Sequence, residues 1–154
     1  MKELFIASLL TALSASAALA QGPSIMGVWL VESGKAHVQI APCADPGRGP
    51  VCGTIVALIN PKGADGKPVE PAIANDFRNP DTNLRDRKVI GQVMSYDFKK
   101  ASEPNTFEGG TIYSAETGKS FKANISLQAD GTLRLRGYIG TPMFGETQIW
   151  TRVR

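Results

Sequence analysis

Residues that carry common catalytic and metal-binding chemistry are scarce in this chain of 154 residues, which contains one histidine and two cysteines. A single histidine excludes metal sites built from several imidazoles. His37 alternates with Val38 and Ile40, so we expect its side chain to point outward from a strand rather than to act as a catalytic base. The G-x-S-x-G, P-loop and H-E-x-x-H motifs are also absent. We therefore assign no catalytic residue, no metal site and no cofactor.

Basic residues are not gathered into blocks, although the formal net charge is +3. A nucleic-acid-binding protein normally concentrates Lys and Arg on one face, with aromatic residues between them. Arg134 and Arg136 do share one face of an expected strand. Glu146 and Gln148 on the following strand are placed to sit opposite them, so we expect cross-strand pairing. The pattern predicts no nucleic-acid partner.

No apolar run in the N-terminal region is long enough to cross a bilayer. The run at residues 4–13 follows Lys2 and precedes a small-x-small Ala-Leu-Ala sequence at 18–20. This arrangement is typical of a cleaved signal peptide at residues 1–20, which leaves a mature domain at 21–154. A retained membrane anchor is the alternative, but no stop-transfer pattern follows. We expect a periplasmic or secreted protein with no integral membrane segment after cleavage.

The two cysteines, Cys43 and Cys52, flank a stretch rich in proline and glycine. Export makes a disulfide between them plausible. A redox pair or a metal-thiolate site would need a C-x-x-C spacing or additional ligands, and the sequence has neither. We expect a structural disulfide that stabilises the domain by about 2–3 kcal/mol.

Alternation of apolar and polar residues predicts about eight strands. Phe121, Ala123 and Ile125 alternate with polar residues, and Asp130-Gly131 suits a tight turn into the next alternating run. The expected strands cover residues 26–32, 36–41, 51–59, 88–98, 106–114, 119–127, 132–138 and 145–152. Most connections are short, so neighbours in sequence should be neighbours in the sheet. We predict an all-β fold, a single eight-stranded antiparallel up-and-down barrel whose closure removes exposed edges.

Residues 60–87 are the exception, because they contain four prolines and no steady apolar period. A connection this long in a compact domain is either functional or conceals an element. Asn79 is a suitable N-cap and Pro80 suits the first helical position, so we expect one short helical turn through Arg85, with Leu84 docked on the barrel. The earlier part of the segment is expected to lack regular hydrogen bonds and to form a mobile lid at the open end of the barrel.

One cluster of oxygen ligands lies in this segment, at Asn79, Asp81, Asn83 and Asp86. The first three have the spacing that opens a calcium loop. Leu84 stands where such a loop requires Gly, and Ile90 stands where it requires a bidentate Glu. We therefore favour helix capping and local ion pairing over calcium binding.

Two motifs at the ends of the domain resemble a known signature. Gly27-Val28-Trp29 is similar to the G-x-W motif of lipocalins and other calycins, in which the Trp closes one end of a barrel beneath an Arg from the last strand. Arg152, two residues after Trp150, is the natural counterpart. An Arg side chain stacks well on an indole. The resemblance implies that Trp29 and Arg152 are in contact at a closed end of the barrel.

A longer set of motifs resembles the bacterial domain-of-unknown-function family numbered 2147. The matching motifs are Gly27-x-Trp29, Val51-Cys52-Gly53-x-Ile55, Asp76-x-x-Asn79-Pro80-Asp81-x-x-Leu84-Arg85, Gly91, Gly109-Gly110-x-Ile112-Tyr113, Gly118-Lys119, Leu135-Arg136-Gly137-Tyr138 and Trp150-x-Arg152. This resemblance implies an exported, calycin-like barrel that holds a small apolar or amphipathic molecule. It supplies no established activity, so no catalytic residue can be carried over.

Three classes of function fit these observations. An exported carrier or binding protein for a small apolar or amphipathic molecule is our prediction, because an eight-stranded barrel can hold one such ligand. The candidate ligand-binding residues are Met94, Tyr96, Phe107, Tyr113, Phe121, Met143 and Phe144. The alternative for these residues is that they simply fill the barrel. A protein-interaction module, such as an inhibitor of a secreted hydrolase, is the second class. It would use the Cys43–Cys52 hairpin or residues 60–87, and an enzyme is the third class.

Overall fold

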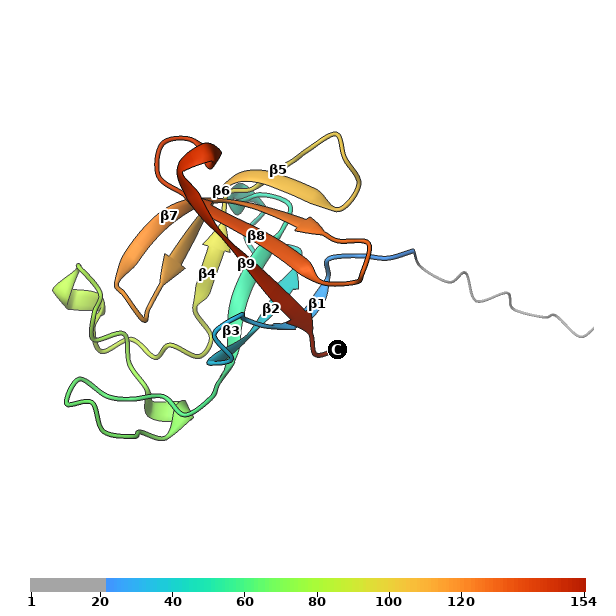
Figure 1. Ribbon diagram of the computed structural model, residues 1–154. Coiled ribbons are helices and arrows are strands. Elements are labelled where there is room, and N and C mark those ends of the chain that lie inside the picture. Colours follow the sequence, from blue (N-terminus) through green and yellow to red (C-terminus); the bar gives the residue numbers. More distant parts are fainter. Residues whose placement is uncertain (1–21) are drawn as a thin grey trace, which may run out of the picture.

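The computed structural model describes residues 22–154 as a barrel with a long loop at one end (Figure 1). The expected signal peptide at residues 1–20 and the expected first mature residue, Gln21, lie outside the described residues. The strands are β1 (Gly27–Leu30), β2 (Ala36–Ala41), β3 (Cys52–Leu58), β4 (Val93–Tyr96), β5 (Lys99–Lys100), β6 (Thr106–Ser114), β7 (Lys119–Leu127), β8 (Leu133–Tyr138) and β9 (Gly145–Arg152). Between residues 22 and 154 the helical segments are short 3-10 turns, and none of them could span a membrane.

The strands form a closed antiparallel barrel in the order β1-β2-β3-β4-β6-β7-β8-β9. Pairing of β9 with β1 and of β4 with β6 completes the ring. The short strand β5 pairs only with β6 and lies outside the ring. The predicted eight-stranded up-and-down barrel is therefore confirmed.

The strand expected at residues 88–98 is shorter than its sequence pattern indicated. Only Val93–Tyr96 forms β4. Lys88 instead pairs with Asn75 in an isolated bridge, and Gly91 adopts a φ of 92°, which interrupts an extended backbone. The segment before β4 therefore belongs to the long loop.

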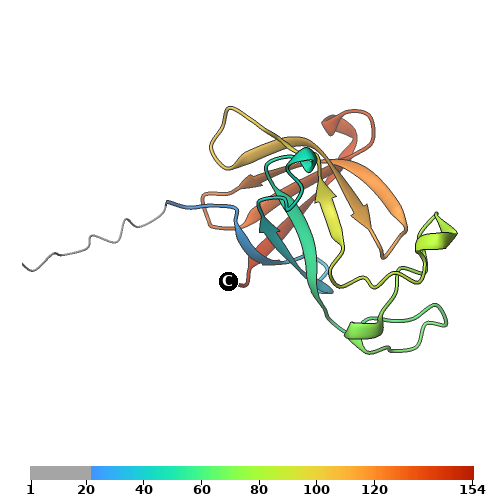
Figure 2. The ribbon, with the colours of Figure 1, turned by 180° about the vertical axis from the view of Figure 1, so that it is seen from behind.

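The two ends of the barrel differ in what covers them. One end, which we call the mouth, carries the connections 31–35, 59–92, 115–118 and 139–144. The opposite end, the closed end, carries the N-terminal segment 22–26 and the connections 42–51, 97–105 and 128–132. The mouth faces left in Figure 1 and right in Figure 2, with the green 59–92 loop beside it.

Trp29 and Arg152 hold the closed end together. They are direct partners in the β1–β9 pairing, and the Arg152 guanidinium lies 4.2 Å from the centre of the buried Trp29 ring. Arg152 also donates to the carbonyl oxygens of Met26, at 2.8 Å, and Ser24. The Trp29 indole donates to the carbonyl of Ile25 at 2.8 Å. The contact between Trp29 and Arg152 is the one that the resemblance to calycins implies. The hydrogen bonds also tie the N-terminal segment across the closed end.

Phe98 fills the closed half of the barrel interior. Its ring is buried, and it packs directly on the backbone of Gly110 in β6. A Cβ at Gly110 would lie 2.4 Å from the Phe98 ring, so only glycine fits at this position. Trp29 and Leu133 belong to the same buried core cluster as Phe98, so large apolar side chains occupy this end.

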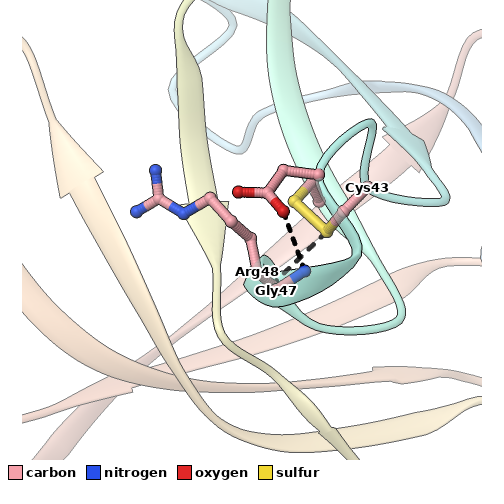
Figure 3. Close-up of a disulfide and its surroundings, with 5 residues drawn as sticks. Cys43, Gly47 and Arg48 are labelled. Carbon is pink, nitrogen blue, oxygen red and sulfur yellow. Dashed lines mark hydrogen bonds between the residues drawn. A yellow bond between two sulfur atoms is a disulfide. The ribbon is translucent and has the colours of Figure 1, made fainter.

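The predicted disulfide is present at the closed end (Figure 3). It links Cys43, which follows β2, to Cys52, the first residue of β3. Between Cys43 and Cys52 the chain makes a 3-10 turn at Pro46–Arg48, which begins at Asp45. The Asp45 carboxylate accepts a hydrogen bond from the Gly47 amide at 2.9 Å. The Cys43–Cys52 hairpin is thus fixed by a covalent bond and a capped turn.

Arg152→Ala should lower the free energy of unfolding by about 1–3 kcal/mol, because it removes the stacking on Trp29 and the bonds to two carbonyls. Urea unfolding followed by tryptophan fluorescence measures the difference. Arg154→Ala is the matched control, since Arg154 is bonded to β1 through its backbone amide and carbonyl oxygen, which the substitution retains. Equal stability of the two variants would contradict the proposed role of Arg152.

Candidate functional site

A cavity of about 1000 Å³ occupies the mouth half of the barrel. Its inner wall is mainly apolar, because inward-facing strand residues at this level are aliphatic or aromatic. The inward-facing wall residues are Val38, Ile55, Met94, Ile112, Phe121, Leu135 and Trp150. Trp29 and Phe98, which are buried at the closed end, do not border the cavity. The barrel is therefore filled at one end and hollow at the other.

Four of the seven candidate ligand-binding residues border the cavity and three do not. Those at the cavity are Met94, Tyr113, Phe121 and Phe144, and those away from it are Tyr96, Phe107 and Met143. The Tyr96 ring lies 3.8 Å from the Arg48 guanidinium, beside the disulfide hairpin. Phe107 is buried in the core opposite Ile125, and Met143 is exposed on the 139–144 loop. The sequence pattern identified apolar residues, but it did not show which of them lie at the mouth end of the barrel, where the cavity is.

The expected pairing of Arg134 and Arg136 with Glu146 and Gln148 is wrong. In the observed register Arg134 lies opposite Ile149, and Arg136 lies opposite Thr147. The Arg136 guanidinium donates to the Thr147 hydroxyl at 3.1 Å. Because side chains alternate along a strand, a shift of one residue moves a whole row to the other face.

Glu146 and Gln148 consequently face the interior and border the cavity. They lie opposite Gly137 and Leu135 in β8. The Gln148 side-chain oxygen accepts a hydrogen bond from the Trp150 indole at 2.9 Å, which leaves its amide group available to the cavity. β9 therefore adds a polar strip to an otherwise apolar wall.

Asp76 anchors the long loop at the mouth, and sequence reasoning did not identify this role. Its side chain is 0% exposed. The carboxylate accepts hydrogen bonds from the Tyr113 hydroxyl at 2.6 Å, the Asn79 amide at 2.8 Å and the Arg87 guanidinium at 3.0 Å. A fourth, longer bond at 3.4 Å comes from Gln92. A buried carboxylate is tolerated only when it is bonded in this way.

Tyr113 connects this network to the barrel, because it belongs to β6 and borders the cavity. Burial, and secondarily the hydrogen bond to the Asp76 carboxylate, raise the pKa of the Tyr113 phenol above its usual value. The phenol therefore stays protonated and continues to donate to Asp76 at neutral pH. The loop is thus attached to the barrel wall by a neutral donor and a charged acceptor.

The helical turn expected at Asn79 begins two residues later and is capped differently. The 3-10 turn covers Thr82–Leu84, and its N-cap is Asp81, which accepts from the Asn83 amide. Asn79 instead bonds to Asp76 and accepts from the amide of Asp81. Leu84, which was expected to dock on the barrel, is 38% exposed. Two of the four residues considered for calcium, Asn79 and Asp81, thus accept backbone amides, as the capping interpretation expects.

The first part of the loop has hydrogen bonds that the sequence analysis did not expect. Lys62 and Pro68 form an isolated antiparallel bridge. The Val69 amide donates to the Pro61 carbonyl at 3.0 Å, and the Gly63 amide donates to the Lys67 carbonyl at 2.9 Å. Residues 61–69 therefore form a small hairpin whose ends lie side by side.

The loop borders the mouth, as expected. Pro61, Ala74 and Phe77 contribute to the cavity lining. Gly118, in the turn between β6 and β7, has a φ of 70°, and a Cβ there would lie 2.1 Å from the Arg78 carbonyl oxygen. The loop backbone therefore rests directly on this turn.

Asp76→Ala should detach the loop, because it leaves four donors without this acceptor. We expect a loss of about 2–4 kcal/mol in the free energy of unfolding. In this variant, hydrogen exchange should accelerate at the backbone amides of positions 76 and 89, which are bonded within the loop. The β7 amides should stay protected. Asp86→Ala, at an exposed site, is the control. Unchanged exchange in the Asp76 variant would refute the anchoring role.

Comparisons with known proteins agree with this architecture. A solved structure whose title reads "Protein HP1028 from the human pathogen Helicobacter pylori belongs to the lipocalin family" matches with a TM-score of 0.66 and 20% sequence identity. The match covers 85% of this chain and 84% of that chain, and it shows a shared fold. Curated protein sequences yield no significant match. A family model described as "Uncharacterized protein conserved in bacteria (DUF2147)" matches residues 27–152. Because this match spans the whole barrel, the chain belongs to the DUF2147 family of bacterial proteins.

Proposed function

We propose that this protein is exported and binds a small apolar or amphipathic molecule in the mouth half of its barrel, as a carrier or binding protein. The observation that supports the proposal is the open cavity of about 1000 Å³ with a mainly apolar wall. Cavities that hold small molecules measure about 300–1,000 Å³ and combine apolar walls with a few polar groups. The volume suits one ligand the size of a fatty acid or larger.

The polar groups favour an amphipathic ligand over a pure hydrocarbon. Glu146 and Gln148 provide a hydrogen-bond acceptor and donor on the wall, and Lys62 and Arg78 lie at the rim. A polar head held near the mouth would leave the apolar tail against Trp150 and Leu135. This arrangement keeps charged groups hydrated while apolar surface is buried.

The expected affinity is moderate and determines how the ligand should be sought. Burial of about 400 Å² of ligand surface contributes about 10 kcal/mol. Association costs at least about 4 kcal/mol. The difference corresponds to a dissociation constant of tens of micromolar. A ligand bound this weakly is lost in long purifications, so rapid isolation is required.

Export is the second part of the proposal. The N-terminal sequence has the pattern of a signal peptide, and the Cys43–Cys52 disulfide persists in oxidising compartments such as the periplasm or the extracellular medium. Both features support a periplasmic or secreted location.

Gly137→Leu tests the cavity directly. Gly137 borders the cavity opposite Glu146, and a Cβ there would meet no heavy atom within 4 Å. A leucine side chain would occupy ligand space without displacing the wall. Gln39→Leu, on the exposed outer face of β2, is the matched control. We expect Gly137→Leu to weaken binding of the neutral probe N-phenyl-1-naphthylamine at least about 10-fold, while the control binds as the wild type does.

Native mass spectrometry of rapidly isolated, exported protein supplies the complementary measurement. A co-purified small molecule that is absent from Gly137→Leu would support the proposal. Failure of the wild type to bind the probe, together with an empty spectrum, would contradict it. That outcome would favour a protein-interaction module built on the Cys43–Cys52 hairpin or the mouth loop.

The hairpin at residues 61–69 should control entry to the cavity. Its ends are adjacent, so residues 62–68 can be replaced by an Asn-Gly turn with a change of less than about 0.5 kcal/mol in stability. We expect the probe to dissociate faster from this variant, because the hairpin no longer borders the mouth. Stopped-flow fluorescence measures the rate. Identical rates and affinities in the two proteins would show that the hairpin does not act as a lid.

A further inference from the structure

The loop at residues 139–144 exposes three large apolar side chains beside the mouth. Ile139, Met143 and Phe144 are 74%, 80% and 78% exposed, more than any other large hydrophobic residue between 22 and 154. Single exposed apolar residues are common, but three on one short loop are not. The loop is visible at the top of the barrel in Figure 1, before β9.

This exposure is built into the structure, because the loop backbone is held in place. The Arg136 guanidinium donates to the carbonyl oxygens of Pro142 at 2.9 Å and Met143 at 3.3 Å. The Phe144 amide donates to the Thr141 carbonyl at 3.1 Å. The three side chains are therefore presented by a fixed loop rather than exposed by fraying.

The strand surface next to this loop is basic. Lys122, Arg134 and Arg136 lie on the outer faces of β7 and β8, and Lys122 and Ile139 border the same shallow surface depression. None of the residues that alternate outward along β7, β8 and β9 is acidic. Glu146 faces the cavity, and Glu32 accepts a hydrogen bond from the Ile149 amide.

A protruding apolar loop beside a basic surface is complementary to an anionic lipid bilayer. Apolar side chains enter the boundary between headgroups and acyl chains, while Lys and Arg contact lipid phosphates. We propose that the 139–144 loop docks this protein on anionic membranes, with Phe144 and Met143 inserted and with Lys122, Arg134 and Arg136 at the headgroups. Because Ile139 and Phe144 also border the cavity, the docked protein presents its mouth to the lipid surface.

Flotation of the mature protein with lipid vesicles tests this docking. We expect binding to vesicles of phosphatidylcholine with 30% phosphatidylglycerol and at least about 10-fold weaker binding to phosphatidylcholine alone, since each basic residue contributes about 5-fold. Met143→Ser should reduce binding, and Met143→Ser with Phe144→Ser should abolish it. Val153→Ser, at an exposed apolar residue near the closed end, should not change it.

The basic surface is tested separately by Lys122→Gln with Arg134→Gln, which leaves the Arg136 bonds to the loop intact. This pair should weaken binding to anionic vesicles about 25-fold. Lys99→Gln with Lys100→Gln removes equal charge from exposed β5 and is the control. If both double variants lost the same affinity for anionic vesicles, net charge alone would explain the effect, and the proposed docking surface would be wrong.

The proposal and the cavity function have separable outcomes. Met143 does not border the cavity, so Met143→Ser should bind N-phenyl-1-naphthylamine as the wild type does while it loses affinity for vesicles. Equal binding to neutral and anionic vesicles, or no binding to either, would overturn membrane docking whatever the probe shows. Self-association that Phe144→Ser abolishes, in place of vesicle binding, would assign the loop to a second copy of the chain and would also overturn it.

Discussion

The pairing of β1 with β9 is the interaction on which the cavity depends, because it turns a sheet into a barrel with a fixed inner width. Two strand residue pairs form this seam, Trp29 with Arg152 and Leu30 with Thr151. Backbone hydrogen bonds of Val28 with Val153 and Arg154 extend it. The stacked guanidinium and its bonds to the N-terminal segment reinforce it. Trp29 both takes part in the pairing that closes the barrel and fills the closed end. The contact that closes the barrel therefore also leaves the cavity at the mouth.

A loop as long as residues 59–92 lowers the stability of a small barrel unless it is attached to the barrel wall. Asp76 attaches the loop, because its buried carboxylate accepts hydrogen bonds both from loop residues and from Tyr113 of β6. The cost of burying that charge is offset only while the loop is in place. The attachment of the loop therefore accounts for the Asp76-x-x-Asn79 motif.

Alternation and turn chemistry predicted four strands with their bounds, β2, β6, β7 and β9. The strand expected at 88–98 shrinks to β4, and the short strand β5 was not predicted. The G-x-W motif likewise placed Trp29 against Arg152. Register was not predictable, since Glu146 and Gln148 fit either face of β9 by pattern alone, and tertiary pairing with β8 decided the matter. The role of Asp76 depends on Tyr113 and Arg87, which are distant in sequence, so no local signal could reveal it.

Methyl NMR of protein labelled at methionine tests ligand binding inside the barrel most directly. The described residues hold Met94 on the cavity wall, Met26 at the closed end and Met143 on the exposed loop. Titration with dodecanol should shift the Met94 methyl resonance in a saturable way and leave that of Met26 unchanged. A titration in which only Met143 responds, or in which no resonance saturates, would contradict a ligand site in the cavity.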